Sequence, residues 1–208
     1  SELSTCPSAG WTRYKTFFDA VSSYAKTKQS NLQISVTGTY SGLIDPNKVP
    51  CFKSLLANAD VVSVTYYPMD SNFKMKSPDV VYEDFKKIVD LYPDKPIYFQ
   101  EAGYSSGSQH VSSSVSLQAQ FIKNVFKGWD KFQPNIKAVS FLNLHEWSQT
   151  QVDGFGTQYQ VCPGSLCSSF KEYLQTLGLR TFSGDGTDKE SFQTLKTEAS
   201  KRGWVADP

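Results

Sequence analysis

The sequence lacks long hydrophobic runs and lacks a strong excess of either charge. Its 208 residues include 21 Lys and Arg against 20 Asp and Glu, so the formal net charge is +1. This balance argues against a polybasic nucleic-acid binder and against an acidic tail protein. The longest apolar stretches, such as Val61-Val62-Ser63-Val64, fall far short of the ~20 residues that a membrane span needs. We therefore expect neither nucleic acid nor a membrane as a partner.

Motifs for phosphate binding, serine catalysis and metal binding are also absent from the sequence. There is no G-x-G-x-x-G, no G-x-x-x-x-G-K-[ST] and no G-x-S-x-G. The two histidines, His110 and His145, lie well away from the closely spaced pair Cys162 and Cys167. Because a zinc site needs such residues together, we expect no metal and no cofactor.

Cysteine is scarce, and its four residues are Cys6, Cys51, Cys162 and Cys167. A Pro-Gly turn would let Cys162 and Cys167 close a small disulfide loop, which leaves Cys6 to pair with Cys51. Free buried thiols are the alternative. An even count with two plausible pairs favours a secreted or extracellular protein.

Helical and strand patterns alternate along the chain. Apolar residues at helical spacing predict helices over 11–29, 51–57, 81–92 and 117–129, whereas β-branched runs predict strands over 33–37, 60–67, 97–101 and 137–143. A Gly/Gln/Ser-rich loop follows, and then helices near 166–177 and 189–202. No low-complexity linker interrupts this order, so we expect one domain over residues 1–208.

Four helix–strand units in strict alternation predict an α/β protein with a parallel sheet and flanking helices. Four parallel strands do not close a barrel. The chain is therefore either an open α/β sheet or half of an eight-stranded barrel, and the alternation alone leaves both open.

Polar and aromatic side chains follow the predicted strands, where parallel α/β folds place their functional residues. Carboxylates beside aromatic rings are typical of sugar chemistry, in which rings stack on pyranoses and carboxyl groups supply nucleophile and proton donor. The candidates in chain order are Tyr40, Tyr66, Tyr67, Glu101, Tyr104, Asn143, His145, Glu146 and Trp147.

Glu101 is the sharpest candidate because it ends an otherwise apolar strand. Alternation places its side chain on the same face as Ile97 and Phe99. A carboxylate on an apolar face needs an explanation, since burying an unpaired charge is costly. A functional carboxylate is one explanation; a strand cap or a partner of a basic side chain is the other.

Three segments carry a resemblance to a known family. Pro96-Ile-Tyr-Phe-Gln-Glu101-Ala-Gly-Tyr-Ser resembles the seventh strand of the retaining (β/α)8-barrel glycoside hydrolases. Ala59-Asp-Val-Val-Ser-Val-Thr-Tyr-Tyr-Pro68 is similar to their sixth strand, and Phe141-Leu-Asn-Leu-His-Glu-Trp147 to their eighth. The stretch 177–189, followed by a helix, looks like the tail of such barrels. The resemblance implies the carboxyl-terminal half of a TIM barrel.

The resemblance also implies roles and a substrate class. Glu101 would be the nucleophile and Trp147 the floor of a sugar subsite in hydrolysis of a β-linked polysaccharide or oligosaccharide. A strand tyrosine would hydrogen-bond Glu101, and we favour Tyr67 over Tyr66 because Ser63 and Thr65 share its face. His145 would orient a substrate hydroxyl or serve as packing. Asn143, Tyr104 and Tyr40 complete the expected substrate contacts.

One departure from the family concerns the acid/base glutamate at the end of the fourth strand, which this chain does not contain. Without this glutamate, general acid–base catalysis, which contributes ~10²–10⁴-fold to the rate, would be missing. The chain is then part of a longer enzyme, a non-catalytic secreted carbohydrate-binding or structural protein, or half of a homodimer that closes one barrel. In a two-fold dimer, Glu146 would face Glu101 of the partner subunit as its acid/base. We therefore expect a homodimer or an amino-terminal partner fragment, besides carbohydrate.

Overall fold

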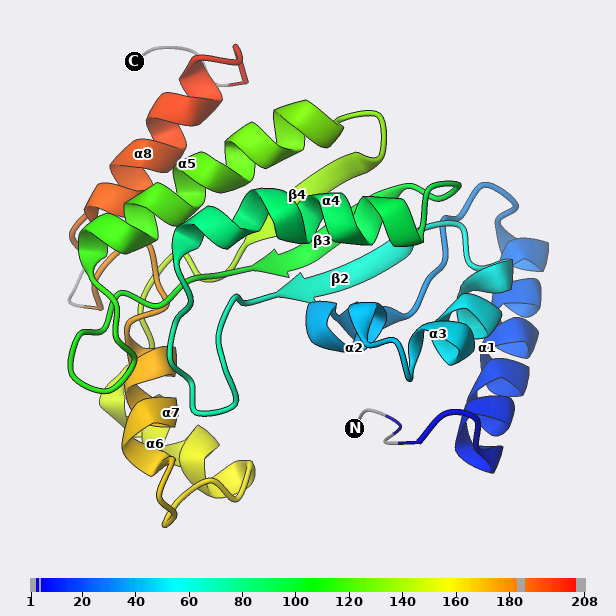
Figure 1. Ribbon diagram of the computed structural model, residues 1–208, viewed down its shortest axis with the longest axis horizontal. Helices are drawn as coiled ribbons and strands as arrows, with labels where there is room; N and C mark the ends of the chain where they lie inside the picture. Colours follow the sequence, from blue (N-terminus) through cyan, green and yellow to red (C-terminus); the bar gives the residue numbers. More distant parts are fainter. Residues whose placement is uncertain (1–2, 4, 183–185, 205–208) are drawn as a thin grey trace. The chain divides into compact units, whose positions relative to one another are not determined.

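A computed structural model describes residues 3, 5–182 and 186–204 (Figure 1). Contacts divide the chain into a first unit, 1–66, 85–101 and 132–140, and a second unit, 67–84, 102–131 and 141–208. Each unit is described by itself. Of the barrel-like tail stretch 177–189, residues 183–185 lie outside the described part of the chain.

The first unit contains almost all of a parallel sheet of four strands in the order β1-β2-β3-β4. The strands are β1 (Thr37–Thr39), β2 (Val62–Tyr66), β3 (Ile97–Ala102) and β4 (Ile136–Phe141). Thr37 of β1 lies opposite Ser63 of β2, and Thr39 lies opposite Thr65. The predicted α/β class with four parallel strands is thus confirmed.

The two faces of this sheet differ sharply in polarity. Val62, Val64 and Phe99 are at most 1% exposed. The ring of Phe99 stacks at 4.4 Å on Phe85, from α4 (Val81–Leu91). The residues that alternate with these apolar residues along the strands, such as Ser63 between Val62 and Val64, are polar. One face is therefore a hydrophobic core under helices, and the other is polar.

Helix α1 (Ala9–Lys28) precedes β1, as the helical spacing of its apolar residues predicts. Trp11 and Phe18 are buried, and Trp11 packs edge-on against Phe52 at 4.9 Å. Phe52 belongs to α3 (Val49–Leu55), which follows the short helix α2 (Tyr40–Ile44). Turns of 3₁₀ helix occupy Leu56–Asn58 and Pro78–Val80.

The first strand is shorter than predicted and lies later in the chain. The strand predicted over 33–37 is wrong in position, because the strand in the structure comprises Thr37–Thr39. Residues before them are held by side chains instead of a full ladder. The Asp60 carboxylate accepts the backbone N–H of Ile34 at 2.8 Å, and Ser35 donates to the carbonyl of Val61 at 2.7 Å.

Asp60 also makes the first unit sensitive to acid. The ammonium of Lys26, at 2.6 Å, and the Ile34 N–H hold the pKa of Asp60 below its usual 3.8. Because the unfolded chain binds this proton more readily, the contribution of Asp60 is complete above about pH 4. This stabilising contribution is lost as the pH falls through the pKa of Asp60 in the folded state, which is below 3.8. We expect Asp60→Asn to lower the thermal midpoint at pH 6 and to have a progressively smaller effect as the pH falls below 3.8. A matched change at the exposed Asp94→Asn should show no such pH dependence, and equal pH profiles for the two variants would refute this role.

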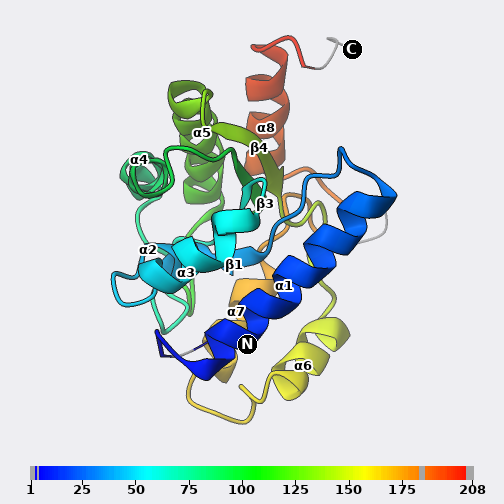
Figure 2. The same ribbon diagram turned by 90° about the vertical axis from the view of Figure 1, so that its right-hand side faces the viewer.

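In the second unit, α5 (Val115–Phe132) and α8 (Glu190–Ser200) lie side by side (Figures 1 and 2). The buried Gln118 links them, since its Oε1 accepts from Ser191 at 2.8 Å. Its Nε2 donates to the carbonyls of Tyr104 at 2.7 Å and Leu177 at 3.0 Å. One buried amide thus ties three segments of this unit together.

The sequence predicted one of two consecutive helices in the second unit. Helix α7 (Cys167–Gln175) was expected, but the Gly/Gln/Ser-rich segment before it is helix α6 (Gln149–Gln158) and not a loop. Its amino terminus has a capping box in which Ser148 and Gln151 bond each other's backbone N–H. This S-x-x-Q pattern was the missed signal.

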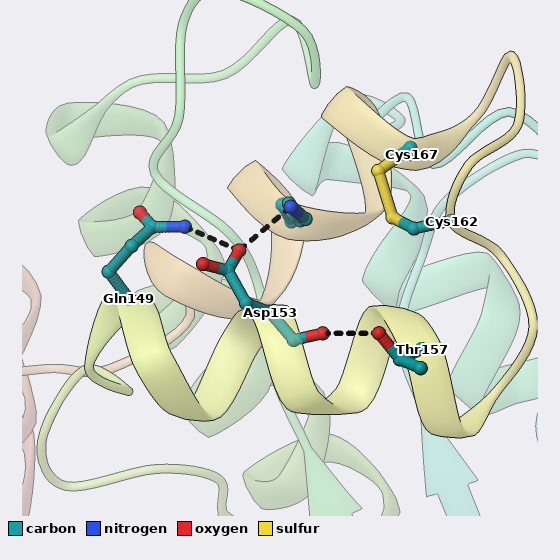
Figure 3. The surroundings of a disulfide bond; sticks show 6 residues. Gln149, Asp153, Thr157, Cys162 and Cys167 are labelled. Atoms are coloured by element: carbon teal, nitrogen blue, oxygen red, sulfur yellow. Dashed lines mark hydrogen bonds and ion pairs between the residues drawn. A yellow bond between two sulfur atoms is a disulfide. The ribbon is translucent and has the colours of Figure 1, made fainter.

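Both expected disulfides are present, Cys6–Cys51 and Cys162–Cys167. The second closes the α6–α7 turn (Figure 3). Beside it, Asp153 pairs with Lys171 at 2.7 Å and accepts from Gln149 at 2.8 Å. Among the described residues no helix combines the length and the apolar character that crossing a bilayer would require. Two disulfides fit an extracellular protein.

Candidate functional site

The polar face of the sheet is hollowed into a cavity of about 580 Å³, called here the sheet-face cavity. Its walls come from β1, β2, β3 and the segments that lead into them. They are Gln33, Ser35, Thr37, Val61, Ser63, Tyr98, Gln100 and Glu101. The hydroxyls of Thr37 and Ser63 bond across the strands at 2.8 Å, and Tyr98 donates to Gln33 at 2.9 Å. The cavity therefore offers hydroxyl and amide groups along its walls.

Glu101 lies at the carboxyl end of β3 and lines this cavity. Ile97 and Phe99, with which alternation places it on one face, are at most 1% exposed, whereas Glu101 is half-buried. The alternation breaks at Gln100 and Glu101, which are both partly accessible, and resumes with the buried Ala102. Glu101 is thus half-buried where it lines the cavity.

Two other candidates of the first unit serve the hydrophobic core. Tyr66 has no exposed surface, and its ring lies 5.6 Å from Phe85 and 5.8 Å from Phe99. Tyr40 packs edge-on against Tyr66 at 5.1 Å. Both rings therefore have a packing role on the helical side of the sheet.

Tyr67 and Tyr104 belong to the second unit. Tyr67 is half-buried and packs edge-on against Tyr173 at 6.0 Å. Tyr104 is only 2% exposed, stacks on Phe121 at 5.1 Å and donates to the carbonyl of Lys76 at 2.6 Å. Burial raises the pKa of Tyr104. Tyr104 has no exposed ring face on which a sugar could stack, so its position is structural.

Glu146 has a structural partner that the sequence did not reveal. Its carboxylate accepts from Lys189 at 2.9 Å, and Lys189 also donates to the carbonyls of Thr176 and Gly178. Lys189 is 7% exposed. Burial lowers the pKa of this ammonium, and Glu146 opposes that change. The Glu146 carboxylate thus neutralises a buried charge within its own unit.

The remaining candidates follow β4 in the second unit. Asn143 is half-buried, and its Nδ2 has no hydrogen-bond partner within the described residues. His145 is exposed, with Nε2 3.3 Å from a guanidinium nitrogen of Arg180. Trp147 is half-buried and packs edge-on against Phe155 at 5.3 Å. Of these three, Asn143 offers the clearest unused donor.

Sequence reasoning missed Glu172, which organises the loop after β3. This α7 side chain accepts the backbone N–H groups of Gln109 at 3.0 Å and Val111 at 2.9 Å, and that of His110. Gly107 allows the approach, because a Cβ there would lie 2.5 Å from Glu172 Cγ. No local pattern marks this residue, since its partners lie some 60 positions away.

Candidate metal ligands do not converge anywhere in the described part of the chain, where no group of three His, Cys, Asp or Glu side chains is placed to hold an ion. The candidates thus separate into a first-unit set, Tyr40, Tyr66 and Glu101, and a second-unit set, Tyr67, Tyr104, Asn143, His145, Glu146 and Trp147. Within the first unit, Glu101 is the one of these that opens onto the polar cavity.

The amino-acid sequence matches no family model and no curated protein. Solved structures do match. GH5_18 from Streptomyces cattleya, in complex with GlcNAc, is 14% identical with a TM-score of 0.61, and the match covers 93% of this chain and 43% of that chain. A β-glucuronidase from Bifidobacterium dentium is 15% identical with a TM-score of 0.61, covering 93% of this chain and 27% of that one.

The xylanase Xyn10A from Cellvibrio japonicus matches at 12% identity with a TM-score of 0.58, over 89% of this chain and 54% of that chain. This chain therefore spans about half, or less, of the length of these structures. At such identities the likeness shows the fold alone. The chain has the four-stranded parallel fold of one half of the (β/α)8 barrel in these structures.

Proposed function

We propose that this chain is part of a secreted protein that hydrolyses β-linked oligosaccharides or polysaccharides, with Glu101 as the nucleophile. The observation that carries the proposal is the position of Glu101, half-buried at the carboxyl end of β3 and open to the sheet-face cavity. Functional groups of parallel β/α folds gather at such strand ends. The fold is also that of GH5_18 from Streptomyces cattleya, solved in complex with Manβ1-4GlcNAc, and of the Bifidobacterium dentium β-glucuronidase, solved with coumarin-3-O-glucuronide.

The chemistry of the cavity suits a sugar. Hydroxyl and amide groups from Ser35, Thr37 and Gln100 can exchange hydrogen bonds with ring hydroxyls. In the retaining reaction, a Glu101 oxygen attacks the anomeric carbon as the bond to the leaving oxygen breaks. A covalent glycosyl ester forms, and water then releases the sugar with net retention. The leaving oxygen also needs a proton donor.

The test of this proposal uses aryl β-glycosides with dinitrophenol as leaving group, because that group departs without a proton donor. We expect Glu101→Gln to lower the rate of dinitrophenol release by on the order of 10³-fold or more, since a nucleophile has been removed. Glu83→Gln, which removes an exposed carboxylate on α4, is the matched control and should keep full activity. Equal rates for the wild type and Glu101→Gln would exclude Glu101 as nucleophile.

A non-catalytic carbohydrate-binding protein is the second candidate, favoured by Asn143 Nδ2, which has no hydrogen-bond partner within the described residues. A buried amide donor without a partner is costly, so a ligand hydroxyl that reached Nδ2 would remove that cost. Calorimetric titration with xylo-, manno- and laminari-oligosaccharides separates the candidates. Binding that Asn143→Ala weakens, without turnover in any variant, would favour a binding protein over the hydrolase.

A further inference from the structure

Three aromatic rings follow one another along helix α6 in the second unit. Trp147, just before the helix, packs at 5.3 Å on Phe155, and Phe155 lies 6.3 Å from Tyr159, the residue after the helix. Phe170 of α7 packs edge-on against Tyr159 at 6.2 Å. These separations are typical of aromatic pairs. Trp147, Phe155 and Tyr159 thus form a continuous row, called here the ring row.

All three members of the ring row have accessible surface. Tyr159 is 62% exposed, and Trp147 and Phe155 are half-buried. Phe170, by contrast, is 7% exposed and supports Tyr159 from α7. A single exposed aromatic side chain needs no explanation, whereas adjoining apolar groups at a surface mark an interaction site. The ring row is therefore a candidate contact surface.

The other side of α6 is occupied by polar contacts within the protein. Asp153 accepts from Gln149 at 2.8 Å and pairs with Lys171 of α7 at 2.7 Å (Figure 3). At about 100° per residue, Phe155 and Tyr159 lie on the side of the helix away from Asp153. The ring row is thus separate from the polar network that joins α6 to α7.

The backbone next to the ring row and beneath it has a rare conformation. Gln160, directly after Tyr159, has a φ of 57°, and Phe73, whose ring lies 5.3 Å from Phe170, has a φ of 62°. Residues other than glycine seldom adopt positive φ, and bulky ones least of all. Such conformations persist where surrounding contacts impose them, and they concentrate at ligand-binding positions. Both observations point to rings that are held in place for a ligand.

The segment that carries Phe155 and Tyr159 has no charge. Residues 154–170 contain no Lys, Arg, Asp, Glu or His, in a protein whose charged residues make up 20%. Gln158 and Gln160, on either side of Tyr159, are exposed. Amide groups donate to and accept from hydroxyls, and aromatic faces pack on apolar C–H groups. A neutral ligand with many hydroxyls and flat apolar faces matches this surface, and such a ligand is a sugar chain.

We propose that the ring row, with Gln158 and Gln160, binds a neutral β-linked polysaccharide chain. The choice of a β-linked chain rests on the proposed function, and the ring row deepens it by making the substrate a long chain. Sugar units stack on the rings while the two amides bond their hydroxyls. A chain that is bound at Trp147 and follows the row reaches Tyr159. Longer oligosaccharides therefore gain a contact that shorter ones lack.

Calorimetric titration of Glu101→Gln protein, which prevents hydrolysis by the proposed nucleophile, tests this surface. The ligands are laminari-, xylo- and mannohexaose and the three matching trisaccharides. In at least one series we expect the hexasaccharide to bind about 10-fold or more tightly than the trisaccharide. Tyr159→Ala should abolish that gain and leave the trisaccharide affinity unchanged, whereas Tyr159→Phe, which keeps the ring, should retain most of it.

The matched control is Tyr24→Ala on α1, because Tyr24 is 65% exposed and lies outside the ring row. It should not change the affinity for any hexasaccharide. Equal hexasaccharide affinity with and without Tyr159→Ala, in protein with an unchanged melting temperature, would overturn the proposal. So would the absence of hexasaccharide binding in all three series.

The ring row and the nucleophile can fail separately. Turnover of dinitrophenyl glycosides that requires Glu101, together with hexasaccharide affinity that ignores Tyr159→Ala, would refute the ring row and keep the nucleophile. Hexasaccharide binding that requires Tyr159, without turnover of any dinitrophenyl glycoside, would support the ring row and refute the hydrolase.

Discussion

Glu146→Gln lowers the free energy of unfolding by about 3–5 kcal/mol, because it leaves the buried Lys189 ammonium without its counter-charge. Lys189 is 7% exposed and its remaining partners are carbonyl oxygens. The loss should diminish as the pH rises toward 10.5, the ordinary pKa of a lysine. Burial already lowers the pKa of Lys189, so the unfolded chain binds its proton more tightly. Raising the pH releases that proton and stabilises the folded state. Urea denaturation at several pH values measures both effects.

The double variant Glu146→Gln/Lys189→Met is the control for this prediction. Removing both charges should cost less than the sum of the single changes, with a coupling of at least about 1 kcal/mol. Turnover of a methyl β-glycoside, whose leaving oxygen needs a proton, should remain near that of the wild type in the folded Glu146→Gln protein. Undiminished stability with lost turnover of that glycoside would restore Glu146 as an acid/base and remove its structural role.

Gly178→Ala is expected to destabilise the protein by about 3 kcal/mol or more, since it overpacks a rigid site. A Cβ at Gly178 would lie 2.3 Å from the backbone N of Glu146 and 2.5 Å from the carbonyl carbon of His145. Neither atom can rotate away as a side chain would. The chain separation here is normally fixed by the bond from Glu146 N–H to the Arg180 carbonyl at 2.9 Å. Thermal denaturation followed by circular dichroism measures the loss.

Gly154→Ala supplies the matched substitution in the same unit. No atom lies within 4 Å of a Cβ at Gly154, which is inside helix α6. Alanine there should stabilise the protein by about 0.5–1 kcal/mol, because glycine is the poorer helix former. If Gly178→Ala proved as harmless as Gly154→Ala, the close approach of these two backbone segments would be refuted.

The elements with strong periodicity were predictable from the sequence. Apolar residues at helical spacing identify α1, α4 and α5 as helices, and a β-branched run identifies β2 as a strand. These patterns are local in the sequence, so they can be recognised without knowledge of the tertiary structure. Pairing of Cys162 with Cys167 was predictable for the same reason, because a short turn joins them. Helix α6 was missed since its composition resembles a loop, and only its capping box indicated a helix.

The sequence predicted that the candidate residues follow strands, but it did not predict which side chains they contact. The role of Glu146 depends on Lys189, 43 residues later, and no spacing rule connects them. The first strand moved to Thr37–Thr39 because side chains of Asp60 and Ser35 hold the preceding residues. Glu101 is half-buried at the end of β3, whereas Ile97 and Phe99 earlier in the strand are buried. The contacts of Glu146 and of the residues before β1 depend on tertiary partners that sequence periodicity does not encode.

Covalent trapping tests the central claim about Glu101 most directly. Dinitrophenyl 2-deoxy-2-fluoro-β-glycosides of glucose, mannose and xylose form the glycosyl ester without a proton donor and release it slowly. Mass spectrometry of peptides should find one added fluorosugar on the peptide that contains Glu101. The adduct should be absent from Glu101→Gln and present in Glu83→Gln. An adduct on another carboxylate, or none with any of the three sugars, would contradict the assignment of Glu101 as nucleophile.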